Sequence, residues 1–220
     1  MSVKTDNRIT QDVLDELAWD PAITITYLRV STDHGRVELK GTAETYGSKM
    51  EAEDAAYRVA GVKWVENDID VDPTAFQRSD QDIRADICSA LALDYQVPDD
   101  RINVGVLDGT AMLTGNVDWY YQRDAAENDV ARIKGVLGID DDITVNQPQA
   151  SATDIASGIS AAFARNGELY DDDIDVATDG GHVTLAGTVE TWSEYDMAEQ
   201  IAWMSPGVTS VANNIEVLLP

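Results

Sequence analysis

The chain contains three copies of one sequence pattern within its 220 residues. Segments 41–71, 115–145 and 187–217 align without a gap. Each segment opens with a glycine and carries a Gly-Val pair twenty residues later. The shared positions are Gly41, Gly61 and Val62 in the first copy, Gly115, Gly135 and Val136 in the second, and Gly187, Gly207 and Val208 in the third. A near-constant period of this length is typical of a repeated supersecondary unit. We therefore expect three small domains that share one fold.

An apolar pattern at helical spacing precedes each segment. Apolar residues four positions apart lie on one face of a helix, and the pairs are Val13 and Leu17, Ile83 and Ile87, and Ile155 and Ile159. We expect this first helix to be N-capped by Asp12, Asp82 or Asp154 in the respective copies. The single cysteine, Cys88, falls in the second of these helices, and we expect it in the helix core.

A β-hairpin is predicted between the helix and the first shared glycine. Apolar residues alternate on both sides of a glycine-containing turn, a pattern typical of paired strands. The turns are His34-Gly35, Asp108-Gly109 and Gly180-Gly181. The first shared glycine of each copy is expected to relieve crowding, or to allow a bend, where the second strand of the hairpin ends.

A second helix and a third strand complete the predicted unit. We expect N-caps at Thr45, Asp118 and Thr191, and we expect the second shared glycine to end the helix as a C′ residue. A strand ending at Val71, Val145 or Val217 follows. The predicted fold class is α+β, with the order α-β-β-α-β, a three-stranded mixed sheet and two helices packed on one face. The predicted domains are residues 1–72, 80–146 and 152–220.

The last strand carries a motif that resembles one protein family. Residues 65–71 and 211–217 read V-x-N-x-I-x-V, and Asp141 replaces the asparagine in the middle copy. With the preceding glycines and the Ala-rich helix, this pattern resembles the BON domain (bacterial OsmY and nodulation), repeated along nearly the whole chain. The resemblance implies non-catalytic roles: envelope maintenance under osmotic stress, binding of phospholipids or client proteins, and ring or lattice building. The family also contains a cytoplasmic relative that senses potassium, so the resemblance implies ion sensing as a further role.

The charge of the chain disfavours several partners. Asp and Glu number 41 against 15 Lys and Arg, which gives a net charge of −26. Nucleic-acid phosphates and anionic membrane surfaces are repelled by such a charge. The composition resembles that of proteins from high-salt surroundings, with loosely associated cations. Two acidic runs, 140–142 and 171–173, lack the ligand spacing of a calcium loop, so we expect no defined metal site and no cofactor.

The sequence predicts no enzyme. Its only histidines, His34 and His182, stand at different offsets from the nearby shared glycines, so the copies share no repeated acid–base constellation. A cytoplasmic location is expected because no signal peptide or membrane-spanning run is visible. The family resemblance implies a periplasmic or extracellular location instead.

Aromatic residues give the candidate binding site. Tyr46, Tyr120 and Trp192 occupy the same position, five residues after the first glycine, and Trp119 and Tyr121 flank the middle one. Such residues at the first turn of the second helix either cover the edge of their own core or contact a neighbouring repeat, a subunit or an amphipathic ligand.

The leading prediction is a binding or assembly protein linked to osmotic or salt stress. The first copy has eight basic residues and the third only Arg165, an asymmetry that favours head-to-tail self-association into rings or filaments. The alternatives are a sensor of K⁺ or divalent cations and a module that binds phospholipid or the envelope surface.

Overall fold

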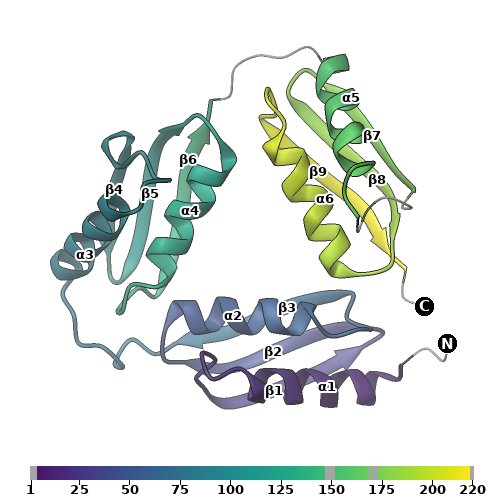
Figure 1. The fold of residues 1–220 in the computed structure, drawn as a ribbon. Helices are drawn as coiled ribbons and strands as arrows, with labels where there is room; N and C mark the ends of the chain where they lie inside the picture. The colour runs from purple at the N-terminus through teal and green to yellow at the C-terminus, as the bar shows by residue number, and fades with distance from the viewer. Residues whose placement is uncertain (1–3, 147–151, 168, 170–172, 219–220) are drawn as a thin grey trace. The chain divides into compact units, whose positions relative to one another are not determined.

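The computed structural model describes residues 4–146, 152–167, 169 and 173–218. Three units of the same architecture follow one another along the chain (Figure 1). Each is described by itself below.

The first repeat confirms the predicted order of elements. Helix α1 (Asp6–Trp19) precedes β1 (Ile25–Asp33) and β2 (Arg36–Ala43), and helix α2 (Tyr46–Tyr57) leads to β3 (Trp64–Val71). The strand order is β1-β2-β3, with β1 antiparallel and β3 parallel to the central strand. The sheet is therefore mixed, as the sequence predicts.

The other two repeats have the same elements. The second contains α3 (Asp80–Leu93), a 3-10 turn η1 (Asp99–Arg101), β4 (Ile102–Leu107), β5 (Thr110–Val117), α4 (Tyr120–Ala131) and β6 (Gly138–Val145). The third contains α5 (Ala152–Phe163), β7 (Asp173–Asp179), β8 (His182–Val189), α6 (Trp192–Met204) and β9 (Ser210–Val217). In both sheets the second strand of the hairpin is again central.

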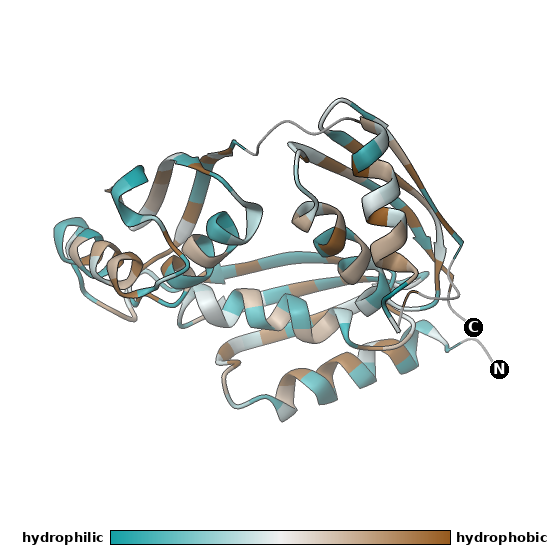
Figure 2. Cartoon of the chain, turned by 45° about the horizontal axis from the view of Figure 1, so that its top comes forward, coloured by the Kyte–Doolittle hydropathy of each residue, from teal (hydrophilic) through white to brown (hydrophobic). Residues whose placement is uncertain are grey.

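Each core lies between the two helices and one face of the sheet. In repeat 1 the buried residues come from every third or fourth position of the helices and every second position of β2, and include Ile9, Val13, Leu17, Val37, Leu39, Ala52 and Ala56. Hydrophobic and hydrophilic residues alternate along the strands (Figure 2). This alternation leaves the other face of each sheet to solvent.

The first helices begin earlier than predicted. The N-caps are Thr5 and Ser79, whose hydroxyls accept from the backbone N–H groups of Arg8 and Asp82. The expected N-caps Asp12, Asp82 and Asp154 lie inside the helices, and Asp12 pairs there with Arg8 at 2.9 Å. The apolar rows mark only the buried face, and one polar turn precedes them. Cys88 is exposed, contrary to the prediction, because it lies off the row of Ile83, Ile87 and Leu91.

Two of the three N-caps predicted for the second helices are confirmed. Thr45 accepts from Ser48 N, and Thr191 forms a capping box with Glu194. In the middle copy α4 begins at Tyr120, so Trp119 stands at the position of the capping threonines and Asp118 lies one residue before it.

The shared glycines serve the backbone. A Cβ at Gly115 would lie 2.2 Å from the carbonyl oxygen of Arg101, and one at Gly187 would lie 2.0 Å from that of Asp173, so crowding excludes a side chain there. These glycines lie inside the central strands and not at a strand end. The second set has positive φ, +106° at Gly61 for example, but follows the C-cap Arg58 by three residues and is not the C′ residue expected.

No helix in the described ranges is long and apolar enough to cross a membrane.

Candidate functional site

One end of repeat 1 gathers the exposed aromatic residues. The loop after α1 is tied to the first turn of α2, because Thr24 N donates to Ser48 Oγ at 2.6 Å and Ser48 Oγ donates to the Ala22 carbonyl at 3.2 Å. The end of α1, the start of β1 and the start of α2 therefore meet. We call this end of each repeat, where the first helix ends and the second begins, its aromatic end.

Two large side chains project from the aromatic end of repeat 1. Trp19, the last residue of α1, is 85% exposed, and Tyr27 is 87% exposed. Tyr27 also has φ +54°, at a register shift between Thr26 and Arg29 that marks a β-bulge in the edge strand. A non-glycine residue in this conformation costs on the order of 1 kcal/mol, and such strain is concentrated at functional sites.

Repeat 2 reproduces the feature with different residues. Leu93 ends α3 at the position of Trp19 and is 86% exposed, and Tyr95 is 95% exposed. The local geometry is the same in both repeats, since Asp20 Oδ1 accepts from Ala22 N at 2.9 Å and Asp94 Oδ1 accepts from Gln96 N at 2.8 Å.

The predicted site residues occupy the same end. Tyr46, Tyr120 and Trp192 are the first residues of α2, α4 and α6, and Trp119 and Tyr121 flank the second of these. Tyr121 is 48% exposed. In repeat 3, Trp192 meets Tyr195 edge-to-face, with ring centroids 4.9 Å apart.

Sequence reasoning missed Trp19, Tyr27, Leu93 and Tyr95 because they belong to no repeated motif. A signal was present for two of them. Trp19 and Leu93 follow the apolar rows at Leu17 and Leu91 by two residues, a spacing that turns a helical side chain away from the core.

Carboxylates border the aromatic end of repeat 1. Glu16 and Asp20 are close to Trp19 in the sequence. Glu16 Oε1 lies 3.2 Å from Arg58 Nε, and Asp20 Oδ2 lies 3.8 Å from Arg58 Nη2. The exposed aromatic rings are thus set in an acidic surface, where attraction between two such surfaces has to come from apolar contact or from cations.

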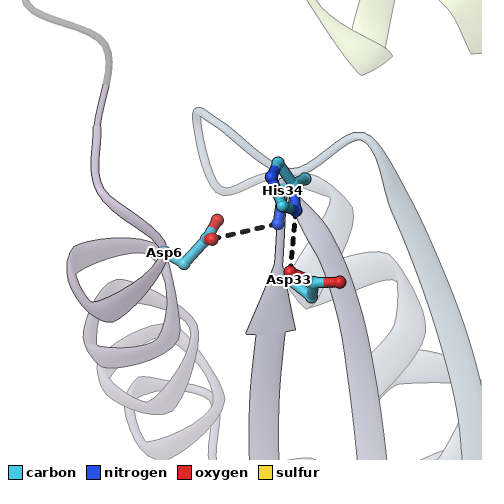
Figure 3. A group of neighbouring side chains, drawn as sticks. All are labelled: Asp6, Asp33 and His34. Carbon is cyan, nitrogen blue, oxygen red and sulfur yellow. Dashed lines mark hydrogen bonds and ion pairs between the residues drawn. The ribbon is translucent and has the colours of Figure 1, made fainter.

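A second cluster lies at the opposite end, where α1 meets the hairpin turn. Ligand-type atoms of Asp6, Asp33 and His34 lie within 4.8 Å of one another (Figure 3). Asp6 accepts from the backbone N–H groups of His34 and Gly35 at 3.0 and 3.1 Å, and these bonds lower the pKa of Asp6.

The cluster is explained by its role in the fold. In repeat 2, Asp80 accepts from the backbone N–H groups of Asp108 and Gly109 in the same way, both at 3.0 Å, without a histidine. In repeats 1 and 2 the carboxylate at the start of the first helix therefore fastens the hairpin turn. We assign no metal to this cluster. Of the acidic run 171–173, where the sequence predicts no defined metal site, Asp171 and Asp172 lie outside the described residues.

His182 contacts a serine on the sheet of repeat 3. Its Nδ1 lies 2.5 Å from Ser210 Oγ, and the histidine side chain is exposed. The pair lies on the solvent-facing side of the sheet and has no enclosure that would exclude water from a reacting group. It offers no support for a catalytic site.

The asparagine of the V-x-N-x-I-x-V motif closes the edge of the third strand. Asn67 and Asn213 accept from the backbone N–H groups of Ile69 and Ile215, each at 3.3 Å. Their amide groups donate to the second helix, where Asn67 Nδ2 reaches the Lys49 carbonyl at 2.9 Å. Each side chain thus occupies an edge N–H group that another strand could otherwise use.

The middle copy keeps this function with a different pair of residues. Asp141 Oδ1 accepts from Ile143 N at 2.9 Å, and Asp141 Oδ2 accepts from Arg123 Nε at 2.7 Å. Arg123 stands at the position of Lys49, so the carboxylate and the guanidinium have changed together.

These features define a protein built of tandem α+β modules, each with one sealed sheet edge. In the first two modules, one end carries exposed aromatic or apolar residues. The chain belongs to the BON domain family. The family model, described as "BON domain", matches residues 5–73, 79–147 and 151–218.

The chain is also similar to known proteins. The chain is 29% identical over 143 residues to "Osmotically-inducible protein Y" of Escherichia coli, a match that covers 63% of this chain and 71% of that protein. Solved structures with some similarity include the C-terminal domain of CdsD, a structural protein of the type III secretion system of Chlamydia trachomatis, and the PrgH periplasmic domain. The first is 14% identical with a TM-score of 0.27, covering 99% of this chain and 100% of CdsD. The second is 12% identical with a TM-score of 0.24, covering 93% and 99%. These TM-scores are too low to support an argument.

Proposed function

We propose that this chain is a non-enzymatic binding and assembly protein that acts through protein–protein contacts, including self-association, under osmotic or salt stress. The link to osmotic stress is supported by the family and by the similarity to an osmotically inducible protein. The observation that carries the contact role is the aromatic end, where Trp19, Tyr27, Leu93 and Tyr95 are each at least 85% exposed.

Physical reasoning connects this surface with assembly. Aromatic side chains give large contact areas and are enriched in protein interfaces. In a chain of charge −26, apolar contact is also the attraction least opposed by like charge. High salt strengthens such contacts further, because it screens the bordering carboxylates. The charge of −26 repels nucleic-acid phosphates and disfavours binding to an anionic lipid surface.

The test compares two aromatic variants with the wild type. One replaces Tyr46, Tyr120 and Trp192 with Ala, and the other replaces Trp19, Tyr27, Leu93 and Tyr95 with Ala. We expect both to reduce the particle mass seen by mass photometry in high salt, with the second variant leaving the melting temperature nearly unchanged because its side chains are exposed.

The matched control is Trp64→Ala, which removes an exposed tryptophan, 54% accessible, from the start of β3. Unchanged particle masses in both aromatic variants would contradict the assignment of the aromatic end. A wild type that stays monomeric at every salt concentration would remove self-association from the proposal.

A further inference from the structure

The six edge strands of the three sheets differ in how they are protected from pairing with another chain. Edge strands expose unpaired backbone groups, and natural proteins protect them with charges, bulges or covering side chains. Strands β3, β6 and β9 have their edges closed by Asn67, Asp141 and Asn213. Strand β1 has the bulge at Tyr27.

The remaining two edges differ in charge. Strand β7 carries Asp173, Asp175 and Asp179, whereas β4 (INVGVL) contains no charged residue and no proline, and its pairing with β5 runs without a register shift. Among the six edges, β4 is the one that combines an uncharged sequence with regular strand geometry.

The hairpin geometry shows which groups of β4 are available. Its two-residue loop is closed by the pair Leu107 and Thr110, which is hydrogen-bonded in hairpins of this type. Backbone groups at Ile102, Val104 and Val106 therefore point away from β5. One of them is occupied, because Arg84 Nε donates to the Val104 carbonyl at 2.8 Å.

The side of α3 that faces beyond β4 carries no acidic residue, because Asp80, Asp82 and Asp86 lie at other positions of the helix. Cys88 and Ala92 follow Arg84 by four and eight residues and so lie on the same side of α3, facing beyond β4. Both are exposed, as is Ala85 three residues before Cys88. This flank consists of small side chains and one cation, in a chain with 41 acidic residues.

We propose that a second copy of this chain docks here, with β4 of one copy pairing antiparallel with β4 of the other and the two α3 flanks in contact. The inference rests on the proposed self-association and adds a second contact surface to the aromatic end. Two chains of charge −26 can approach most closely where neither presents a carboxylate. The small residues on the flank allow close approach of the helices.

A two-fold axis at Val104 sets the register of the pairing, and it requires the Val104 carbonyl to be released from Arg84 Nε. It places Ile102 opposite Val106 and Asn103 opposite Gly105, with no like charges opposed within the strand. Just beyond the strand, Asp100 of one copy would face Asp108 of the other. That repulsion limits the pairing to about five residues and makes the contact depend on salt.

Cys88 lies close to the same axis. In repeat 1, Thr10 Oγ1 donates to Thr32 Oγ1 at 2.8 Å, so the equivalent Arg84 stands over Val106. Four residues along a helix and two along a strand both advance by about 6 Å, which places Cys88 over Val104. The two cysteines of a dimer would therefore face each other.

The experiment uses this native thiol as a reporter. Brief oxidation of the full chain in 1 M KCl should give a disulfide-linked dimer on non-reducing gels. The matched controls are C88S/L14C and C88S/S160C, which move the thiol to the equivalent positions of the first and third repeats. We expect at least fivefold less dimer from both, and equal dimer from the three proteins would overturn the proposal.

A charge pair gives an independent readout. A85E/A92E adds two carboxylates to the α3 flank, and Q11E/A18E adds two at the equivalent positions of α1. The first should weaken dimerisation at least tenfold in sedimentation velocity and the second should not. Wild-type-like dimerisation of A85E/A92E would refute this surface while leaving the proposed function standing. A dimer lost only in the aromatic variants would assign self-association to the aromatic ends instead.

Discussion

Asp129 shows how one side chain departs from the pattern of the repeats. Its position in α4 corresponds to Ala55 in α2 and Ile201 in α6, both buried core residues. In the described part of the chain, Asp129 Oδ2 is buried with no hydrogen-bond partner. Burial, and then the nearby Asp94, raises the pKa of Asp129.

Asp129→Ala should therefore stabilise the protein. Removing a buried carboxylate oxygen without a partner is worth about 1–3 kcal/mol in the free energy of unfolding at pH 7. Because the folded-state pKa is raised, the penalty is present above that value and is relieved as the pH falls through it. Urea denaturation at pH 7 and pH 4 checks both points, and a variant less stable than wild type at pH 7 would show that the carboxylate has a stabilising partner.

Asp6 makes the opposite contribution at the N-terminus of α1. Backbone N–H groups of His34 and Gly35 lower its pKa below the ordinary value of 3.8. Its contribution to stability is thus present above the ordinary value and is lost as the pH falls through the lowered one.

Asp6→Ala should loosen the first hairpin at neutral pH. We expect faster amide exchange at His34 and Gly35 by NMR, and a difference in melting temperature from wild type that shrinks as the pH is lowered below 3.8. Asp80→Ala is the matched variant in repeat 2, and the third repeat, with Ala152 at this position, is the internal reference. Unchanged exchange at both turns would contradict the fastening role.

At the scale of elements, the third strand and the second helix are joined by one side chain. Asn67 and Asn213 use an amide for this contact, whereas Asp141 uses a carboxylate whose side chain is 6% exposed and pairs with Arg123, 33% exposed. A nearly buried carboxylate without its cation is costly, so the two residues of repeat 2 depend on each other.

A double-mutant cycle tests this dependence. Arg123→Lys alone loses the fixed Nε–H contact, and Arg123→Ala should cost about 2 kcal/mol of unfolding free energy. Asp141→Asn is the second single change of the cycle. R123K/D141N recreates the Lys49 and Asn67 residues of repeat 1 and should lose less stability than the two single changes added together. Additive effects of the two single changes in guanidinium denaturation would show that the residues act independently.

The order of the helices and strands can be predicted from the sequence, but their exact ends and their exposed apolar residues cannot. The glycines, apolar rows and third-strand motif predict the α-β-β-α-β order, which the structure confirms. Helix starts were misplaced because caps such as Thr5 and Ser79 stand a turn before the first buried residue. The exposed residues Trp19 and Tyr27 were not foreseen, because exposure of an apolar side chain depends on where its element ends and on a bulge that no motif encodes.

For the whole molecule, charge dominates the response to solvent. A net charge of −26 opposes the compact state through self-repulsion, which salt screens. We expect the melting temperature to rise by about 5 °C or more between 10 mM and 1 M KCl. Sucrose at matched osmolarity is the control for excluded-solute effects. A melting temperature independent of KCl would show that the acidic surface is already neutralised by close ion pairs.

The sealed third-strand edge has a consequence for how far an assembly can grow. A sheet that can be extended on both sides can add partners without limit, as fibrils do. Here Asn67, Asp141 and Asn213 close one side of every sheet, and only the opposite side of the second sheet is uncharged and regular. Growth by strand pairing would then stop once two chains have met, because the pairing uses up the one edge that is uncharged and regular. Any larger structure would have to be linked through a different kind of contact, and the two modes could be switched on separately.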